Sequence, residues 1–189
     1  QYSAVVGDSG PFKTRAQSLI YHLIGFRDYK VKIGKDPGRD RKRFASLPSN
    51  IRLRVDANNL FTDPEKCLSH LRSLGREIWA IEEPVRVGDV QGQSHVSEAM
   101  GSRIILDESL YLKEQLLAYQ NYDDRWIANI RVSKCGGILR SIDLAHAAQE
   151  QGIDVILGAH VGETSILSRA ALTVGQSLND PALAREGAF

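Results

Sequence analysis

The amino-acid sequence predicts an α/β protein of the TIM-type (β/α) barrel class, and three observations lead to this prediction. Short apolar segments alternate with amphipathic helical patterns along the 189 residues. The predicted strands recur at a nearly constant interval, long enough for one strand, one helix and two loops. A charged residue stands at the end of five successive predicted strands, and in a barrel all such ends meet at one mouth.

The predicted strands cover residues 3–6, 29–33, 51–55, 78–81, 103–106, 126–132 and 154–157. The clearest helix is predicted over 64–74, because Asp63 can cap it, Pro64 stands in its first turn, and Cys67, Leu68 and Leu71 follow at helical spacing. Further helices are predicted over 139–149 and 165–178. Neither G-x-G-x-x-G nor G-x-x-x-x-G-K-[ST] occurs, which argues against an open nucleotide-binding sheet.

The composition is that of a soluble enzyme-sized domain. The formal net charge is +1, so the sequence predicts neither nucleic acid nor a membrane as partner. No apolar run approaches the roughly 20 residues that span a bilayer. The two cysteines form no C-x-x-C pair, which favours a reducing, cytoplasmic location.

Two lysines share one face of the second predicted strand. Since side chains alternate along a strand, Tyr29, Val31 and Ile33 face the helices, while Lys30 and Lys32 point to the opposite, inward face. Each ammonium disfavours protonation of the other, and this helps make one lysine a usable base. Solvated lysines on an edge strand are the alternative that the K-x-K pattern alone leaves open.

Three carboxylates end the next three strands: Asp56, Glu82 and Asp107. Together and unpaired they would repel one another, and a hard divalent cation resolves this repulsion. An all-oxygen ligand set predicts Mg²⁺, with Mn²⁺ as the alternative metal. The competing interpretation is that these carboxylates cap helices or pair with Arg52 and Arg54.

The sixth and seventh segments add cationic and polar groups at the predicted mouth. Arg131 and Lys134 follow the sixth strand and are predicted catalytic residues beside Lys30 and Lys32. The Gly-Gly pair after Lys134 allows close approach of the backbone before a helix. Asn58, His160 and Glu163 are predicted substrate-binding residues. A hydrogen-bonded loop histidine is the alternative interpretation of His160.

These motifs resemble the enolase superfamily, and within it most closely the muconate-lactonizing-enzyme subgroup with its mandelate racemase relatives. The resemblance rests on five ordered motifs: Lys30-x-Lys32, Asp56-x-Asn58, Glu82-Glu83-Pro84, Asp107-Glu108-Ser109 and Lys134-x-Gly136-Gly137. It implies a barrel of the modified (β/α)7β kind over residues 1–189, with the N-terminal capping domain lacking and the C-terminal end incomplete. We therefore expect this stretch to be a piece of a longer chain, weakly active or inactive alone.

The resemblance also implies a mechanism. Asp56, Glu82 and Asp107 would bind Mg²⁺, Lys32 would take the α-proton of a small carboxylate substrate, and the metal would stabilise the enolate. The expected enzyme is a lyase or isomerase: a cycloisomerase, a syn-dehydratase or a racemase/epimerase. The full-length form is expected to be a homo-oligomer.

Arg131 departs from the subgroup, which usually has lysine there. Arginine stays protonated, so two-base racemisation is in question, with Lys134 as a substitute base. The alternatives are an acid-sugar dehydratase that uses His160 and a non-catalytic barrel fragment.

Overall fold

The computed structural model describes residues 2–120, 125–160 and 162–187, and its chain forms two compact units. One unit spans Ser3–Ile104, and the other comprises Gln1–Tyr2 with Ile105–Phe189. The boundary falls inside strand β5 (Arg103–Leu106). Each unit is described by itself. No helix in the described part of the chain has the length and apolar character of a membrane span.

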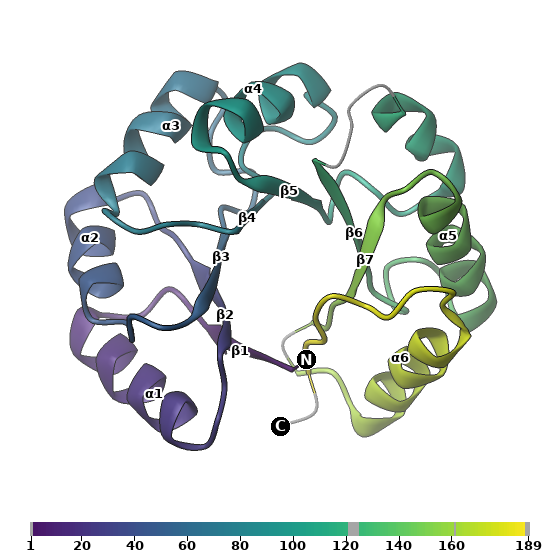
Figure 1. Ribbon diagram of the computed structural model, residues 1–189, viewed down its shortest axis with the longest axis horizontal. Coiled ribbons are helices and arrows are strands. Elements are labelled where there is room, and N and C mark those ends of the chain that lie inside the picture. Colours follow the sequence, from purple (N-terminus) through teal and green to yellow (C-terminus); the bar gives the residue numbers. More distant parts are fainter. Residues whose placement is uncertain (1, 121–124, 161, 188–189) are drawn as a thin grey trace. The chain divides into compact units, whose positions relative to one another are not determined.

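The unit Ser3–Ile104 is built from βα repeats. Its elements, in order, are β1 (Ser3–Val6), α1 (Pro11–Leu23), β2 (Asp28–Lys32), α2 (Pro37–Ala45), β3 (Arg52–Asp56), α3 (Pro64–Ser73), β4 (Ala80–Glu82) and α4 (Val90–Met100). Strands β1 to β4 pair in parallel, each with the next along the chain. Helices α1 to α4 lie along one side of these strands (Figure 1).

Register and side-chain direction in this unit follow the predicted alternation. The β2–β3 register places Lys32 beside Asp56, and the β3–β4 register places Asp56 beside Glu82. Tyr29 is fully buried, and its hydroxyl donates to the carbonyl oxygen of Ser18 on α1. The prediction that Tyr29 faces the helices, opposite to Lys30, is therefore confirmed.

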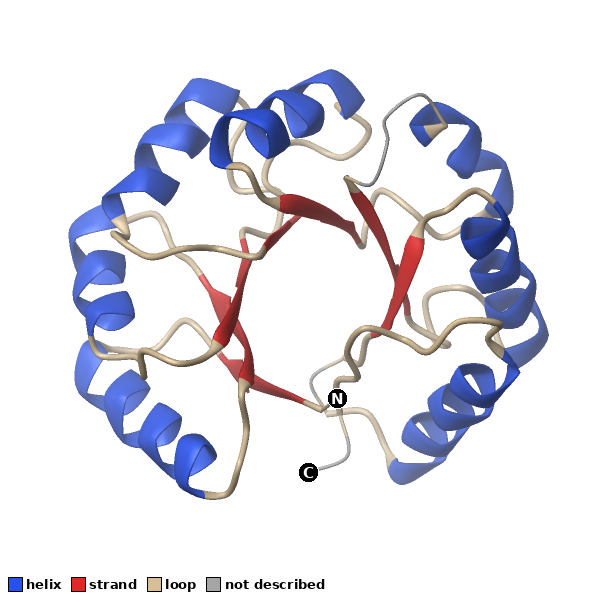
Figure 2. Ribbon diagram, in the orientation of Figure 1, coloured by secondary structure: helices blue, strands red, loops and turns tan. Residues whose placement is uncertain are grey.

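The unit that contains Ile105–Phe189 holds η1 (Lys113–Tyr119), β6 (Trp126–Ile130), α5 (Ile138–Glu150), β7 (Asp154–Leu157) and α6 (Ser165–Ser177). Strands β6 and β7 pair in parallel, and α5 and α6 flank them in blue in Figure 2. The predicted strands and helices agree with the observed ones to within about two residues, which is the ordinary uncertainty of element ends.

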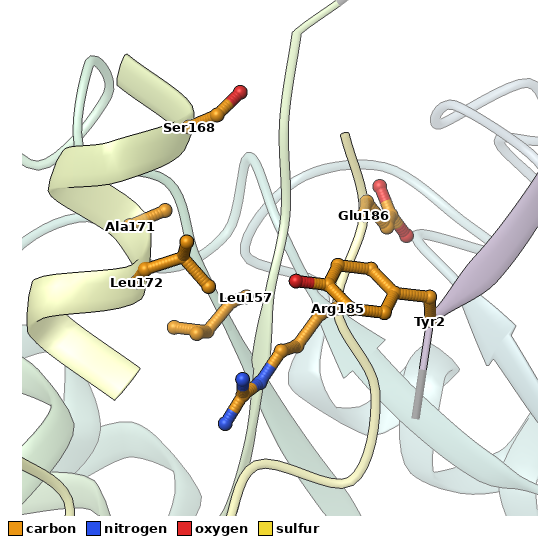
Figure 3. Close-up of a pocket in the computed structure, with 7 residues that line it drawn as sticks. All are labelled: Tyr2, Leu157, Ser168, Ala171, Leu172, Arg185 and Glu186. Carbon is orange, nitrogen blue, oxygen red and sulfur yellow. The ribbon is translucent and has the colours of Figure 1, made fainter. Parts of the chain in front are cut away.

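A segment near the C-terminus pairs with the free side of β7. The N–H of Leu183 donates to Val155, that of Leu157 to Ala184 and that of Glu186 to Leu157, all between main-chain atoms. The sequence predicts a barrel that is incomplete at its C-terminal end, and residues 188–189 lie outside the described part. In Figure 3, Arg185 lies close to Tyr2 and Leu157, in a small pocket beside α6. None of the predicted site residues lines this pocket.

Capping residues mark where the helices after β2, β3 and β4 begin. Asp36, Asp63 and Asp89 each accept a hydrogen bond from a main-chain N–H in the first turn of α2, α3 and α4. Proline stands in the first turn of α2 and α3, where its missing N–H costs nothing. The charged site residues Lys32, Asp56 and Glu82 stand at the last positions of β2, β3 and β4, just before the loops that lead to these caps.

Candidate functional site

One group of charged side chains, the Lys32 cluster, lies at the ends of β2, β3 and β4. It consists of Lys30, Lys32, Asp56, Asn58 and Glu82. The Nζ of Lys30 lies 2.8 Å from Oε1 of Glu82 and 3.2 Å from Oδ2 of Asp56. The Nζ of Lys32 lies 3.5 Å from the same Asp56 oxygen and 3.0 Å from Oδ1 of Asn58. Both ammonium groups therefore converge on one carboxylate oxygen.

The two lysines differ in exposure. The side chain of Lys30 is 7% exposed, and that of Lys32 is 33% exposed. A buried ammonium is stable only with anionic partners, which Asp56 and Glu82 provide for Lys30. The Lys32 side chain, by contrast, is partly open to solvent.

A tight turn after β3 orients Asp56. Its Oδ1 accepts from the main-chain N–H of Asn58 at 3.1 Å and also from the Asn58 side-chain amide. Asn58 adopts φ of 46°, in the left-handed region that asparagine tolerates better than most residues. Because the turn engages Oδ1, Oδ2 is left directed toward the lysines.

The end of β4 is also bent. Glu83 has φ of 43°, an uncommon conformation for a residue other than glycine or asparagine. Its carboxylate is buried and accepts a hydrogen bond from the Gln93 side chain of α4 at 3.3 Å. The bend separates the directions of the two adjacent glutamates, so Glu82 faces Lys30 while Glu83 faces α4.

A second group, the Asp107 cluster, lies in the other unit and consists of Asp107, Asn129, Arg131, Lys134 and His160. Lys134 Nζ donates to Oδ1 of Asp107 at 3.0 Å, to the Asp107 carbonyl oxygen at 2.7 Å and to the Asn129 carbonyl oxygen at 2.8 Å. An ammonium has three N–H donors, and all three of Lys134 are engaged. Arg131 Nη2 lies 2.5 Å from Oδ2 of Asp107.

The contact with Arg131 determines which ring nitrogen of neutral His160 carries the proton. The Nη1 of Arg131 lies 3.0 Å from Nδ1 of His160. Because guanidinium can only donate, Nδ1 must accept, and the proton of the neutral imidazole then sits on Nε2. The carboxylate of the predicted residue Glu163 accepts from the Ser133 hydroxyl at 3.0 Å, and its main-chain N–H donates to the His160 carbonyl oxygen at 3.2 Å.

The carboxylates of the Lys32 cluster suit a hard divalent cation. Asp56 and Glu82 are 2% and 1% exposed, adjacent in register, and offer oxygen ligands, the type that Mg²⁺ prefers. A cationic ammonium, that of Lys30, already contacts both. Over residues 2–120, 125–160 and 162–187, no three His, Cys, Asp or Glu side chains are arranged to hold a metal ion. Asp56 and Glu82 therefore place carboxylate oxygens side by side at the ends of β3 and β4, and their role as metal ligands stays a prediction.

The structure brings together most of the predicted residues, in two groups. Lys30, Lys32, Asp56, Asn58 and Glu82 contact one another in one unit, and Asp107, Arg131, Lys134 and His160 do so in the other. Arg52 and Arg54, which the competing interpretation pairs with the three carboxylates, each form an ion pair with Asp28, at 2.6 Å and 3.1 Å.

Sequence reasoning missed a buried network behind Lys32. It is formed by Asp40, Arg43 and His70, which lie on α2 and α3. The only trace in the sequence is an acidic and a basic residue three positions apart on a very polar helix, a spacing that usually marks a solvated surface. The burial of these groups results from tertiary packing and cannot be read from the local sequence.

Comparisons with known proteins agree with this geometry. The family described as "Enolase C-terminal domain-like" matches residues 13–187. An N-succinyl-L-Arg/Lys racemase of Bacillus cereus is 31% identical over 177 residues, which are 91% of this chain and 47% of the racemase. A hydrophobic dipeptide epimerase of Enterococcus faecalis is 28% identical over 78% of this chain and 43% of its own length.

Solved structures give the same fold. The crystal structure of a dipeptide epimerase from Enterococcus faecalis, complexed with Mg and the dipeptide L-Leu-L-Tyr, matches with a TM-score of 0.86 and 24% identity. The match covers 98% of this chain and 53% of that one. The chain spans about half the length of these relatives. The predicted α/β barrel class and the predicted superfamily are confirmed, and this chain belongs to the enolase C-terminal domain-like family.

Proposed function

We propose that this chain supplies the barrel part of an Mg²⁺-dependent enzyme that removes the α-proton of a carboxylate substrate. The position of Lys32 carries this proposal. Its side chain is one-third exposed, and its ammonium contacts Asn58 and Asp56. Lys30 is buried against Asp56 and Glu82, so it supports the charge balance and Lys32 acts as the general base.

Asp56 and Glu82 are the proposed metal ligands in this unit, with Mg²⁺ preferred over Mn²⁺. Mg²⁺, when bound, supplies positive charge that holds the substrate carboxylate and lowers the cost of an enolate. Asp107 belongs to the other unit, and its role as third ligand stays a prediction from the family resemblance. Asn58 is proposed to orient both the Asp56 carboxylate and the Lys32 ammonium, which it contacts.

The substrate class is proposed from the names of the relatives. They act on an N-succinylated amino acid or on dipeptides, in which the α-carbon lies between an acylated nitrogen and a carbonyl group. We infer that this enzyme takes a small carboxylate of the same kind. His160, which is exposed, and Glu163, which is half-buried, follow the end of β7 and are proposed to contact the substrate.

Arg131 shapes the proposed reaction. Inverting a carbon centre requires one group that removes a proton and another that delivers one from the opposite face. Arg131 remains protonated and is held by Asp107 and His160, so it stabilises negative charge and does not serve as a base. Lys134 has all three donors engaged and holds Asp107 in place. We therefore propose that the α-proton is removed from the Lys32 face alone, and that Arg131 stabilises the enolate that forms.

The geometry argues against an acid-sugar dehydratase with His160 as base. A base needs a free lone pair, and Nδ1 of His160 is engaged by Arg131 while Nε2 carries the proton. The non-catalytic alternative is decided by the exchange experiment that follows.

The test follows α-proton exchange in D₂O by NMR, with the complete native protein and a panel of N-succinyl amino acids and dipeptides of both configurations. We expect Mg²⁺-dependent deuterium incorporation into one configuration, with little inversion, and loss of exchange with a chelator. Metal-independent exchange, or no exchange with any carboxylate of the panel, would contradict the proposal. Equal exchange of both configurations with rapid inversion would overturn the one-face assignment.

A further inference from the structure

A buried side-chain network holds the backbone that carries Lys32. Arg43 of α2 is fully buried, and its guanidinium donates to the carbonyl oxygen of Gly7 at 2.7 Å and to that of Lys32 at 2.8 Å. These carbonyls stand at the ends of β1 and β2. The rigid, planar fork of arginine fixes the direction of both bonds at once, which a lysine ammonium on a flexible stem does not.

Asp40 holds the next part of the same turn. Its Oδ2 accepts from the main-chain N–H of Gly34 at 2.8 Å, and its Oδ1 accepts from Nη1 of Arg43 at 2.6 Å. His70 of α3 places Nε2 3.2 Å from Oδ2 of Asp40. Burial alone would raise the pKa of Asp40, but hydrogen bonds from His70, Gly34 and Arg43 outweigh it and hold the pKa below its ordinary value.

Three successive backbone positions are therefore fixed where Lys32 leaves the sheet. The carbonyl of Lys32 is held by Arg43, the N–H of Ile33 donates to the Asp56 carbonyl at 3.0 Å, and the N–H of Gly34 is held by Asp40. We name Asp40, Arg43 and His70 the strand-end clasp. Its main-chain hydrogen bonds end on Gly7, Lys32 and Gly34, on either side of Ile33 in the case of the last two.

The clasp is a costly way to gain stability. Desolvation offsets most of the attraction in a buried ion pair, and well-packed apolar residues are often as stable. What a buried arginine adds is a fixed geometry for the groups that it contacts. A proton transfer is sensitive to such geometry, because a misplacement of about 1 Å can reduce the rate about 100-fold.

We propose that the strand-end clasp positions Lys32 for proton transfer, with Arg43 as the central positioning residue. Arg43 touches no reacting atom and acts through the backbone of Lys32. The kinetic part of this inference rests on the proposed function, and the backbone part stands on the hydrogen bonds alone.

The test compares Arg43→Lys with a matched control, Arg54→Lys, in the complete native protein. Arg54 is also fully buried and paired, with Asp28 at 3.1 Å and the Ser3 hydroxyl at 2.6 Å, but it does not contact Lys32. Both variants lose a buried guanidinium, so both should lose thermal stability. We expect only Arg43→Lys to lower kcat for α-proton exchange, by about 10- to 100-fold, with KM and Mg²⁺ affinity retained.

A second readout does not depend on activity. Amide hydrogen exchange should quicken at Ile33 and Gly34 in Arg43→Lys and stay as in the parent in Arg54→Lys. If Arg43→Lys fails to fold, Asp40→Asn replaces it in the experiment. We then expect a smaller fall in kcat and a smaller increase in amide exchange at Ile33 and Gly34. Equal kcat in the two arginine variants, or unchanged amide exchange at Ile33 and Gly34, would overturn the inference. Absence of α-proton exchange in the parent would overturn the proposed function instead, and the amide readout would still decide the clasp.

Discussion

The Lys32 cluster and the Asp107 cluster contain similar residues, but their lysines differ in exposure and in hydrogen-bond partners. Each has a lysine beside a carboxylate, yet the Lys32 side chain is 33% exposed and that of Lys134 is 11% exposed. Lys134 directs its three donors at three acceptors, two of them main-chain carbonyls. Lys32 contacts side chains on one side and solvent on the other. Residue type alone thus does not distinguish the partly exposed Lys32 from Lys134, whose three donors are all engaged, whereas the pattern of contacts does.

Replacing the lysine proposed as the base tests the comparison most severely. We expect Lys32→Ala to reduce α-proton exchange by about 10²- to 10⁴-fold, the usual contribution of general base catalysis, while the fold persists. Lys35→Ala is the control, because Lys35 is exposed three positions further along the same segment. Exchange in D₂O is followed by NMR and folding by circular dichroism. Exchange at the parent rate in Lys32→Ala would show that another residue is the base.

Removal of the charge at the centre of the Asp107 cluster should have the next largest effect. Asp107→Asn leaves Arg131 and Lys134 without their shared carboxylate, and we expect Mg²⁺ affinity to fall by at least about tenfold and turnover to be lost. Glu108→Gln is the control, since Glu108 is adjacent in sequence, more exposed, and 3.7 Å from Arg131. Titration calorimetry measures the metal affinity. Unchanged affinity in Asp107→Asn would remove Asp107 from the metal site.

Arg131→Lys sharpens the comparison by introducing a residue that can lose its proton. We expect exchange to appear in the opposite configuration of the substrate, together with slow inversion, at some loss in the original rate. Chiral chromatography and NMR report the two products. If rate and stereochemistry both stay as in the parent, Arg131 has a structural function only.

Lys134→Met should affect folding more than chemistry. It removes the ammonium that donates to the carbonyls of Asp107 and Asn129 and to the Asp107 carboxylate, and a hydrogen bond that involves a charged group contributes about 1.5–3 kcal/mol. Lys113→Met, at an exposed pair with Asp143, should change the free energy of unfolding by less than about 1 kcal/mol. Urea unfolding compares the two variants. A stable Lys134→Met that has lost its exchange activity would instead make Lys134 a catalytic residue.

The fold could be predicted from local pattern because parallel βα units repeat the same physical problem. Each strand of the first unit is buried, each helix needs a start, and residues such as Asp63 with Pro64 mark that start in the sequence. The predicted strands over 103–106 and 154–157 match β5 and β7. The pairing of residues 183–186 with β7 was harder to foresee, since this segment carries no alternating apolar pattern and is held by main-chain bonds.

The positions of the site residues followed from strand periodicity, but their states did not. Alternation along β2 put Lys30 and Lys32 on one face, and the strand interval put Asp56 and Glu82 beside them. That Lys30 is buried and Lys32 partly exposed depends on the depth of each side chain under its neighbours. The engagement of Nδ1 of His160 by Arg131 likewise depends on a contact between residues far apart in the chain.

The sequence by itself determined the class of fold, the family and the residues that gather at the strand ends, because periodicity and motif order are local properties of a chain. Only the tertiary structure decided which lysine is partly exposed and which has all its donors engaged, and only it placed Arg43 against the backbone of Lys32 and Asp40 against that of Gly34. The physical reason is that protonation, exposure and hydrogen-bond direction depend on the low-dielectric surroundings that distant segments create on packing.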